Sequence, residues 1–427
     1  MDHPNILYLH SHDTGRYIQP YGYAVPMPHL QRLAESGYLF RQAFCASPTC
    51  SPSRAALLTG MAPHNNGMVG LAHFGFMLND YSQHMIHTLR QEAGYTSIIA
   101  GEQHIARDPA QIGFDILLQD GRPPEQRAAA FLRGAPSQPF FLDIGFNATH
   151  RVYPEPGPLD NPNYVRPPSV IPDLPETRED MAGYITLARK LDEQMGVVLD
   201  ALDDSGLAQN TLVICTTDHG LAFPGMKCNL TDHGTGVLLI LRGPGGFQGG
   251  QVSDALVSQI DVFPTLCDLL GIEPPPWLQG TSILPLVRGA VDKIHDAVFG
   301  EINFHVSVEP QRSVRTSRWR YIRRFDGRSR PVLTNTDDSP SKTVWLEYGW
   351  RERSVPEEQL YDLIFDPGET NNLAGDPGIQ DIKAMLRSRL DEWMQATDDP
   401  LLRGPLVWPA GFPGLDPDQT SPSEIKF

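Results

Sequence analysis

The chain has 427 residues, 40% of them hydrophobic, and its 34 basic and 51 acidic residues give a net charge of −17. This length can bury a sizeable core and allows two or three domains, whereas the negative charge argues against nucleic acid or an anionic membrane as a partner. No run approaches the roughly 18 apolar residues that a transmembrane helix needs.

The N-terminal residues and the cysteine pattern predict a cytoplasmic protein. The chain passes almost directly from Met1 into a strand-like run at 5–10, with no basic region followed by the apolar region of a secretory leader. Its five cysteines are an odd number and lack the spacing of a disulfide framework. Both observations favour a reducing compartment.

Short apolar runs alternate with amphipathic stretches, which predicts an α/β fold with a large, mostly parallel sheet flanked by helices. A proline-rich segment at 153–175 is predicted to be a surface loop. The expected elements, in chain order, are a strand at 5–10, helices at 29–36 and 84–93, strands at 96–100 and 139–146, a helix at 179–203, strands at 211–217 and 236–241, and a helix at 258–270.

A change of composition near residue 300 predicts a second, smaller unit. We expect strands at 313–324 and 360–363 and an amphipathic helix at 379–394, which together form an α+β subdomain with an antiparallel sheet. The predicted domains are a large α/β domain at 1–300, this subdomain at 301–400 and a proline-rich tail at 401–427. The tail could pack on its own domain or on a neighbouring subunit, so a homo-oligomer stays open.

The most informative motif is Cys50-Ser51-Pro52-Ser53-Arg54, followed by Ala-Ala-Leu-Leu-Thr-Gly. Residues 53–58 suit a short helix that Gly60 ends, so Cys50 and the first free backbone N–H groups face one place, which attracts anions. Arg54 adds a planar cation that can bind two oxygens of a sulfate or phosphate. Three residues separate Cys50 from Arg54, which is fewer than separate the catalytic cysteine and arginine of thiol-dependent phosphatases. The motif therefore does not fit that class of enzyme.

Together with Ser47-Pro48-Thr49, this motif resembles the signature of the formylglycine-dependent (type I) sulfatases of the alkaline-phosphatase-like superfamily. The resemblance implies that a formylglycine-generating maturase oxidises Cys50 to an aldehyde. One hydroxyl of the hydrated aldehyde attacks the sulfur or phosphorus of an ester, and the second hydroxyl later expels the oxyanion. The run Leu360-Tyr361-Asp362 resembles the C-terminal subdomain of sulfatases, so the likeness covers nearly the whole chain and implies their sandwich fold.

Polar residues follow two of the predicted strands, where ligands bind in open α/β sheets. His12 and Asp13 follow the first strand, and Asp218 and His219 follow the strand at 211–217. The resemblance implies that Asp13, Asp218 and His219 bind one divalent cation, with His12 where an aspartate is usual. The family implies Ca²⁺, whereas imidazole ligands suit Mn²⁺ or Zn²⁺.

Three further residues match catalytic positions of the family. The resemblance implies that His104 supports the nucleophile or the bound oxyanion and that His150 protonates the leaving alcohol. Histidine suits that transfer because its ordinary pKa is near 6.5. Lys227 matches the lysine that binds the ester oxyanion and, with Arg54, places two positive charges where charge develops.

Other residues are candidates for binding the substrate. Glu102 stands where the family usually has lysine, so it either faces a positive substituent such as an amine or binds a structural partner. The predicted walls around the leaving group include Arg16, Tyr17, His73, Asn303 and His305. The sequence of residues 65–71 resembles that of the heparan N-sulfatase (sulfamidase) group. This resemblance favours, as the substrate, a sulfate ester or sulfamate of a small or carbohydrate-like molecule.

Three alternative functions stay open. Asp218-His219 and His12 also fit a phosphodiester or phosphonate monoester hydrolase with the same aldehyde and metal. The spacing of His10, His12 and Asp13 suggests a dinuclear zinc hydrolase, although Thr14 stands where that motif has another histidine. An unconverted Cys50 would leave a protein that binds sulfated ligands without hydrolysing them.

Overall fold

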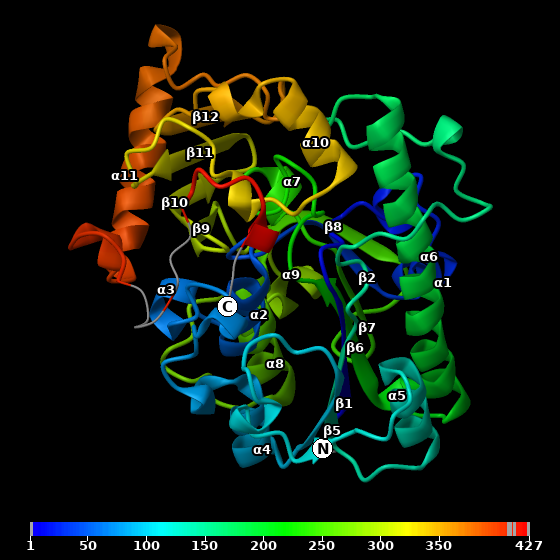
Figure 1. The fold of residues 1–427 in the computed structure, drawn as a ribbon. Helices are drawn as coiled ribbons and strands as arrows, with labels where there is room; N and C mark the ends of the chain where they lie inside the picture. The colour runs from blue at the N-terminus through cyan, green and yellow to red at the C-terminus, as the bar shows by residue number, and fades with distance from the viewer. Residues whose placement is uncertain (1–2, 408–411, 413–415, 425–427) are drawn as a thin grey trace.

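The larger of the two sheets has eight strands, in the order β4-β3-β5-β1-β6-β7-β2-β8. Figure 1 labels the part of this sheet from β5 to β8. A computed structural model of the chain describes residues 3–407, 412 and 416–424. Strand β7 is antiparallel to β6 and β2, and the other pairs are parallel, which confirms the predicted α/β architecture. The strands are β1 (Asn5–Ser11), β2 (Tyr38–Phe44), β3 (Thr96–Gly101), β4 (Ile116–Leu117), β5 (Phe140–Gly145), β6 (Thr211–Thr217), β7 (Leu239–Arg242) and β8 (Gln251–Ser258).

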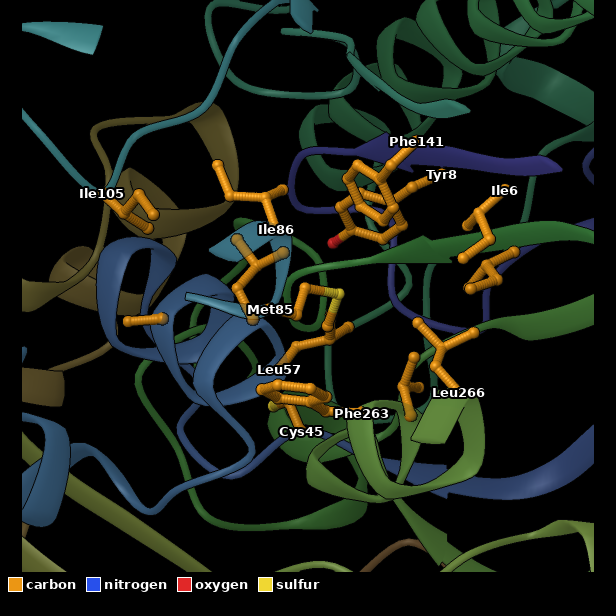
Figure 2. Packing of buried hydrophobic residues seen from close by; sticks show 14 of the residues in the cluster. Ile6, Tyr8, Cys45, Leu57, Met85, Ile86, Ile105, Phe141, Phe263 and Leu266 are labelled. Atoms are coloured by element: carbon orange, nitrogen blue, oxygen red, sulfur yellow. The ribbon is translucent and has the colours of Figure 1, made fainter. Parts of the chain in front are cut away.

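Helices cover both faces of this sheet, so strand residues of alternating direction pack into two separate cores. Ile6 and Tyr8 of β1 belong to one core, part of which Figure 2 shows, and Leu7 and Leu9 belong to the other. The first core contains residues of α2 (Cys50–Thr59), α4 (Met85–Ala93) and α8 (Val262–Leu270). The second contains residues of α1 (Pro28–Ser36), α5 (Pro124–Arg133) and α6 (Pro175–Asp204).

The smaller sheet is antiparallel, in the order β12-β11-β10-β9. Its strands are β9 (Val298–Phe304), β10 (Val308–Arg315), β11 (Trp319–Arg324) and β12 (Glu358–Asp362), and α11 (Gln380–Ala396) packs on it. The prediction of one strand over 313–324 is wrong. The Thr316 hydroxyl accepts hydrogen bonds from the backbone N–H groups of Arg318 and Trp319, which turns the chain into a hairpin.

The shorter helices include α3 (Pro63–Asn66), α7 (Asp232–Thr235), α9 (Leu284–Val287) and α10 (Pro340–Glu347). Among the described residues, no helix is both long and apolar enough to cross a bilayer. In the predicted tail, 408–411, 413–415 and 425–427 lie outside the described part of the chain. The described tail binds its own chain, since Arg328 pairs with Asp418 and the Ser421 hydroxyl hydrogen-bonds to Asp338.

Candidate active site

The candidate site lies at the carboxyl ends of β1 and β6, two neighbouring parallel strands. The backbone of Asp13 adopts the left-handed conformation at φ 58°, which aspartate tolerates better than most residues. Its N–H donates a hydrogen bond to Asp218 Oδ1 at 2.8 Å, so the ends of the two strands are tied together. Topology therefore brings together side chains that are far apart in the sequence.

Cys50 is the first residue of α2, which begins three residues earlier than the predicted 53–58 helix. A proline at position 52 is compatible with this start because the first helical turn needs no backbone donor there. Gly60 ends the helix at φ 68°, as predicted. The Cys50 side chain is thus held at a helix N-terminus that faces the ends of β1 and β6.

Four candidate ligand groups converge beside Cys50. His219 Nε2 lies 3.3 Å from Cys50 Sγ and 3.3 Å from Asp13 Oδ1. His12 Nε2 lies 3.2 Å from Asp218 Oδ2. One ligand atom from each of His12, Asp13, Cys50 and Asp218 lies within 4.8 Å of the others. Two carboxylates and two imidazoles therefore surround one point next to residue 50.

These residues fit a bound cation. Both ring nitrogens of His12 and Oδ1 of Asp13 are buried and have no hydrogen-bond partner among the described residues. Buried polar atoms are normally satisfied, and leaving one unpaired costs about 1–3 kcal/mol. Burial, with Arg54 and His150, lowers the pKa of His12 well below its usual value, so its ring stays neutral and can offer a lone pair.

His10 is not available as a metal ligand. Its Nδ1 accepts a hydrogen bond from Arg54, which can only donate, and its Nε2 lies 2.8 Å from Asp143 Oδ1. The dinuclear zinc motif would need His10 as a ligand, so the structure contradicts that alternative. His10 instead holds Arg54 in place.

Two buried cations border the cluster. Arg54 donates to Asp218 Oδ2 at 2.9 Å and to the Ser11 carbonyl at 3.0 Å. Lys227 Nζ lies 3.0 Å from Asp13 Oδ2 and 3.0 Å from Asp337 Oδ2. Burial alone would lower the pKa of Lys227, but Asp13 and Asp337 raise it well above its usual value. Both groups are therefore charged at neutral pH, and Asp337 is a site residue that the sequence analysis missed.

The predicted histidines lie around the same point. The ring of His12 lies 4.5 Å from that of His150 and 5.5 Å from that of His104, between centroids. His104 stacks on His73, with His73 Nδ1 3.2 Å from His104 Nε2. Burial, with Arg54 and His73, lowers the pKa of His104 to about 3. His104 is therefore a neutral group at working pH.

Other predicted substrate residues have different surroundings. Arg16 pairs with Asp232, and the Asn303 amide, which is 2% exposed, hydrogen-bonds to Glu301 and Arg312. The structure therefore builds Arg16 and Asn303 into other networks. His305 is buried, and its Nδ1 has no hydrogen-bond partner among the described residues. Burial, together with the charge of Lys227, lowers the pKa of His305 well below its usual value.

Glu102 lies close to the site without a partner. Its carboxylate makes no hydrogen bond or ion pair with the described part of the chain, while its backbone N–H donates to the Gly145 carbonyl at 3.0 Å. Burial would lower the pKa of Arg54, but Asp218 and, more weakly, Glu102 raise it. Within the described residues, the structural partner that the sequence analysis considered for the Glu102 carboxylate is therefore not found.

The Cys50 thiol is a poor nucleophile as it stands. Burial raises its pKa well above the usual value, and Asp13 and Asp218 add to this effect, although Lys227 opposes it. A protonated thiol reacts slowly, because the thiolate is the nucleophilic form.

Two family profiles match the chain. The one described as Sulfatase matches residues 4–121 and 126–272. The one described as N-sulphoglucosamine sulphohydrolase, C-terminal, matches residues 227–344. Together they extend over the larger sheet and over β9, β10 and β11 of the smaller one, and the first includes Cys50 and all four candidate ligands.

Individual relatives agree with these matches. N-sulphoglucosamine sulphohydrolase of Homo sapiens is 31% identical over 451 residues, which cover 90% of this chain and 88% of the human protein. An ulvan-active sulfatase of Formosa agariphila is 30% identical over 442 residues, covering 98% of this chain and 86% of its own. A structure described as in complex with its substrate D-glucosamine-2-N,6-O-disulfate shares the fold, with a TM-score of 0.73, 19% identity and coverage of 95% of this chain and 99% of that one.

Proposed function

Because the chain belongs to the sulfatase family and is a sulfuric ester hydrolase of the heparan N-sulfatase-like group, we propose that it removes sulfate from a sulfated saccharide. The leaving group is an alcohol or an amine of the sugar. The names of the ulvan-active relative and of the glucosamine-disulfate complex support a saccharide substrate. We further propose that a maturase converts Cys50 to formylglycine and that one divalent cation binds beside it.

The observation that carries this proposal is the convergence of His12, Asp13 and Asp218 on Cys50, within 4.8 Å. Asp13, Asp218 and His219 would hold the cation, with His12 as a further ligand. When bound, the cation supplies positive charge that polarises the sulfate oxygens. Carboxylates suit Ca²⁺, whereas the imidazoles equally suit Mn²⁺ or Zn²⁺.

Different residues of the protein then supply the nucleophile, the charges that hold the sulfate and the proton for the leaving group. The hydrate at position 50 supplies a hydroxyl nucleophile, which the buried thiol does not. Arg54 and Lys227 hold the sulfate oxygens and stabilise the charge that builds on them. The Nδ1–H of His150 donates to the Arg151 carbonyl at 2.6 Å, so Nε2 is the ring nitrogen left for catalysis. In its imidazolium form the ring delivers the Nε2 proton to the leaving oxygen or nitrogen.

Rates on matched sulfur and phosphorus substrates test the reaction class. We expect kcat/KM for an aryl sulfate and for glucosamine 2-N-sulfate to exceed that for an aryl phosphonate monoester and an aryl phosphodiester by about tenfold or more, which is about 1.4 kcal/mol of transition-state stabilisation. The expectation follows from the match to the sulfatase family, because Arg54 and Lys227 could bind the oxygens of either kind of ester. Faster turnover of the phosphorus esters would favour the phosphonate hydrolase instead.

Removal of the metal should lower both activity and stability. A ligand at 100 times its Kd stabilises the folded state by about 2.7 kcal/mol, so EDTA should lower Tm and readdition of Ca²⁺, Mn²⁺ or Zn²⁺ should restore it. Elemental analysis should find about one ion per chain, and Asp218→Asn should lose it. Asp261→Asn is the control, because Asp261 is equally buried but pairs with His295 at 2.8 Å, outside the cluster. An unchanged metal content in Asp218→Asn would contradict the assignment.

A further inference from the structure

A groove lined by aromatic residues lies between α10 with the residues that follow it and the segment 172–174 that precedes α6. Its volume is about 530 Å³, within the range of small-molecule sites. Its lining consists of Pro172 and Leu174 before α6, Val344 and Trp345 of α10, and Tyr348, Trp350 and Arg353 after it. None of these residues takes part in the chemistry described above.

The lining has the chemistry of a saccharide site. The rings of Trp345 and Trp350 are perpendicular, with centroids 5.1 Å apart, and Tyr348 is 79% exposed. Flat aromatic rings with a polar edge pack against the apolar faces of sugar rings while their N–H and O–H groups bind hydroxyls. Arg353 is the one charged residue lining the groove, and its guanidinium has no hydrogen bond or ion pair within the described residues.

The groove is connected to the candidate site at two points. The Trp345 ring lies 3.1 Å from the position that a Cβ would take on Gly225, at the turn that leads to Lys227. Helix α10 also follows Asp337 directly, and Asp337 pairs with Lys227. Because an eight-residue helix is about 12 Å long, the groove residues at the end of α10 lie about that far from its first residue, Pro340.

We propose that this groove is a second saccharide-binding site, which holds sugar residues of a sulfated oligosaccharide away from the sulfate that is removed. The inference rests on the proposed function. A protein of net charge −17 repels a sulfated chain over most of its surface. An arginine without an ion pair in an aromatic groove therefore provides a local positive charge to which a second sulfate can bind.

Kinetics on two substrates of different length test the groove. The probes are glucosamine 2-N-sulfate and a heparin-derived tetrasaccharide with an N-sulfated glucosamine at its non-reducing end. Trp350→Ala and Tyr348→Ala should each raise KM for the tetrasaccharide about tenfold, as for an aromatic anchor of a binding site, without changing kcat. Both should leave KM for the monosaccharide unchanged. Arg353→Gln should raise KM for the tetrasaccharide and weaken its salt dependence.

The control is Phe365→Ala, because Phe365 is 83% exposed and is not among the groove residues. Equal effects of a groove variant on both substrates would overturn the proposal. So would a dimer, seen by light scattering, that Tyr348→Ala dissociates, because the groove would then be an interface between copies of this chain.

A separate measurement distinguishes failure of the groove from failure of the proposed function. If the wild-type protein hydrolyses neither probe, the proposed function is wrong. In that case the groove is still tested by measuring, through tryptophan fluorescence, how tightly the tetrasaccharide binds to the Cys50→Ala protein. Loss of about tenfold in affinity on adding Trp350→Ala supports the site, and no binding at all overturns it.

Discussion

Replacement of Cys50 by alanine should abolish turnover while leaving the protein folded. The variant has no atom that can become the nucleophile, so we expect kcat to fall on the order of 10⁴-fold or more, as when an essential nucleophile is removed. Its stability should fall by only about 1 kcal/mol, because one buried sulfur is lost. Turnover of glucosamine 2-N-sulfate and thermal unfolding measure the two effects separately.

Cys45→Ala is the matched control for this variant. Cys45, which Figure 2 shows in the core, is as buried as Cys50 and belongs to the same core. It is not among the groups that converge on the candidate metal site. We expect it to lose a similar amount of stability and to keep its activity. Activity retained in Cys50→Ala would contradict the assigned nucleophile.

Lys227→Met should produce the second large effect. The methionine keeps most of the side-chain volume but removes the charge that Asp13 and Asp337 share at 3.0 Å each. Loss of a buried partner costs about 3–5 kcal/mol of stability, because the remaining charges are left uncompensated. Loss of a group that stabilises the transition state should lower kcat/KM about 10²- to 10³-fold, measured well below Tm.

Lys342→Met separates the two effects. Lys342 is also buried, and its Nζ lies 3.0 Å from Asp338 Oδ1 and 2.6 Å from the Thr336 carbonyl. This variant should also lose stability, although less than Lys227→Met because Asp338 is 47% exposed, and should keep kcat/KM within about twofold. Equal losses of kcat/KM in both variants would show that Lys227 acts only through the fold.

The central strands were predictable because they are continuous apolar runs. All seven residues of β1 and of β6 are buried, which is typical of parallel strands covered on both faces. Strands β2 and β8 were not predicted, since Arg41 interrupts the first with an exposed charge and β8 begins with two exposed residues. Their place in the sheet is fixed by pairing with each other, which periodicity does not reveal.

The site residues that directly follow strands were predictable from the sequence. Those that a loop brings to the site from elsewhere in the chain were not. Asp13 and Asp218 follow neighbouring strands, so the topology rule brings them together. Asp337 carries no motif and reaches Lys227 only through the loop before α10. Asn303 was grouped with His305, yet it lies two residues from Glu301 on the same face of β9 and binds that carboxylate at 3.1 Å.

The central claim is that residue 50 is an aldehyde in the active protein. Trypsin releases residues 42–54 as one peptide, which contains both Cys45 and position 50. In protein produced with a formylglycine-generating maturase, mass spectrometry should find a thiol at 45 and an aldehyde at 50, and the aldehyde fraction should rise in proportion to turnover. A preparation that hydrolyses its sulfate substrate at full rate with only a thiol at position 50 would contradict the account.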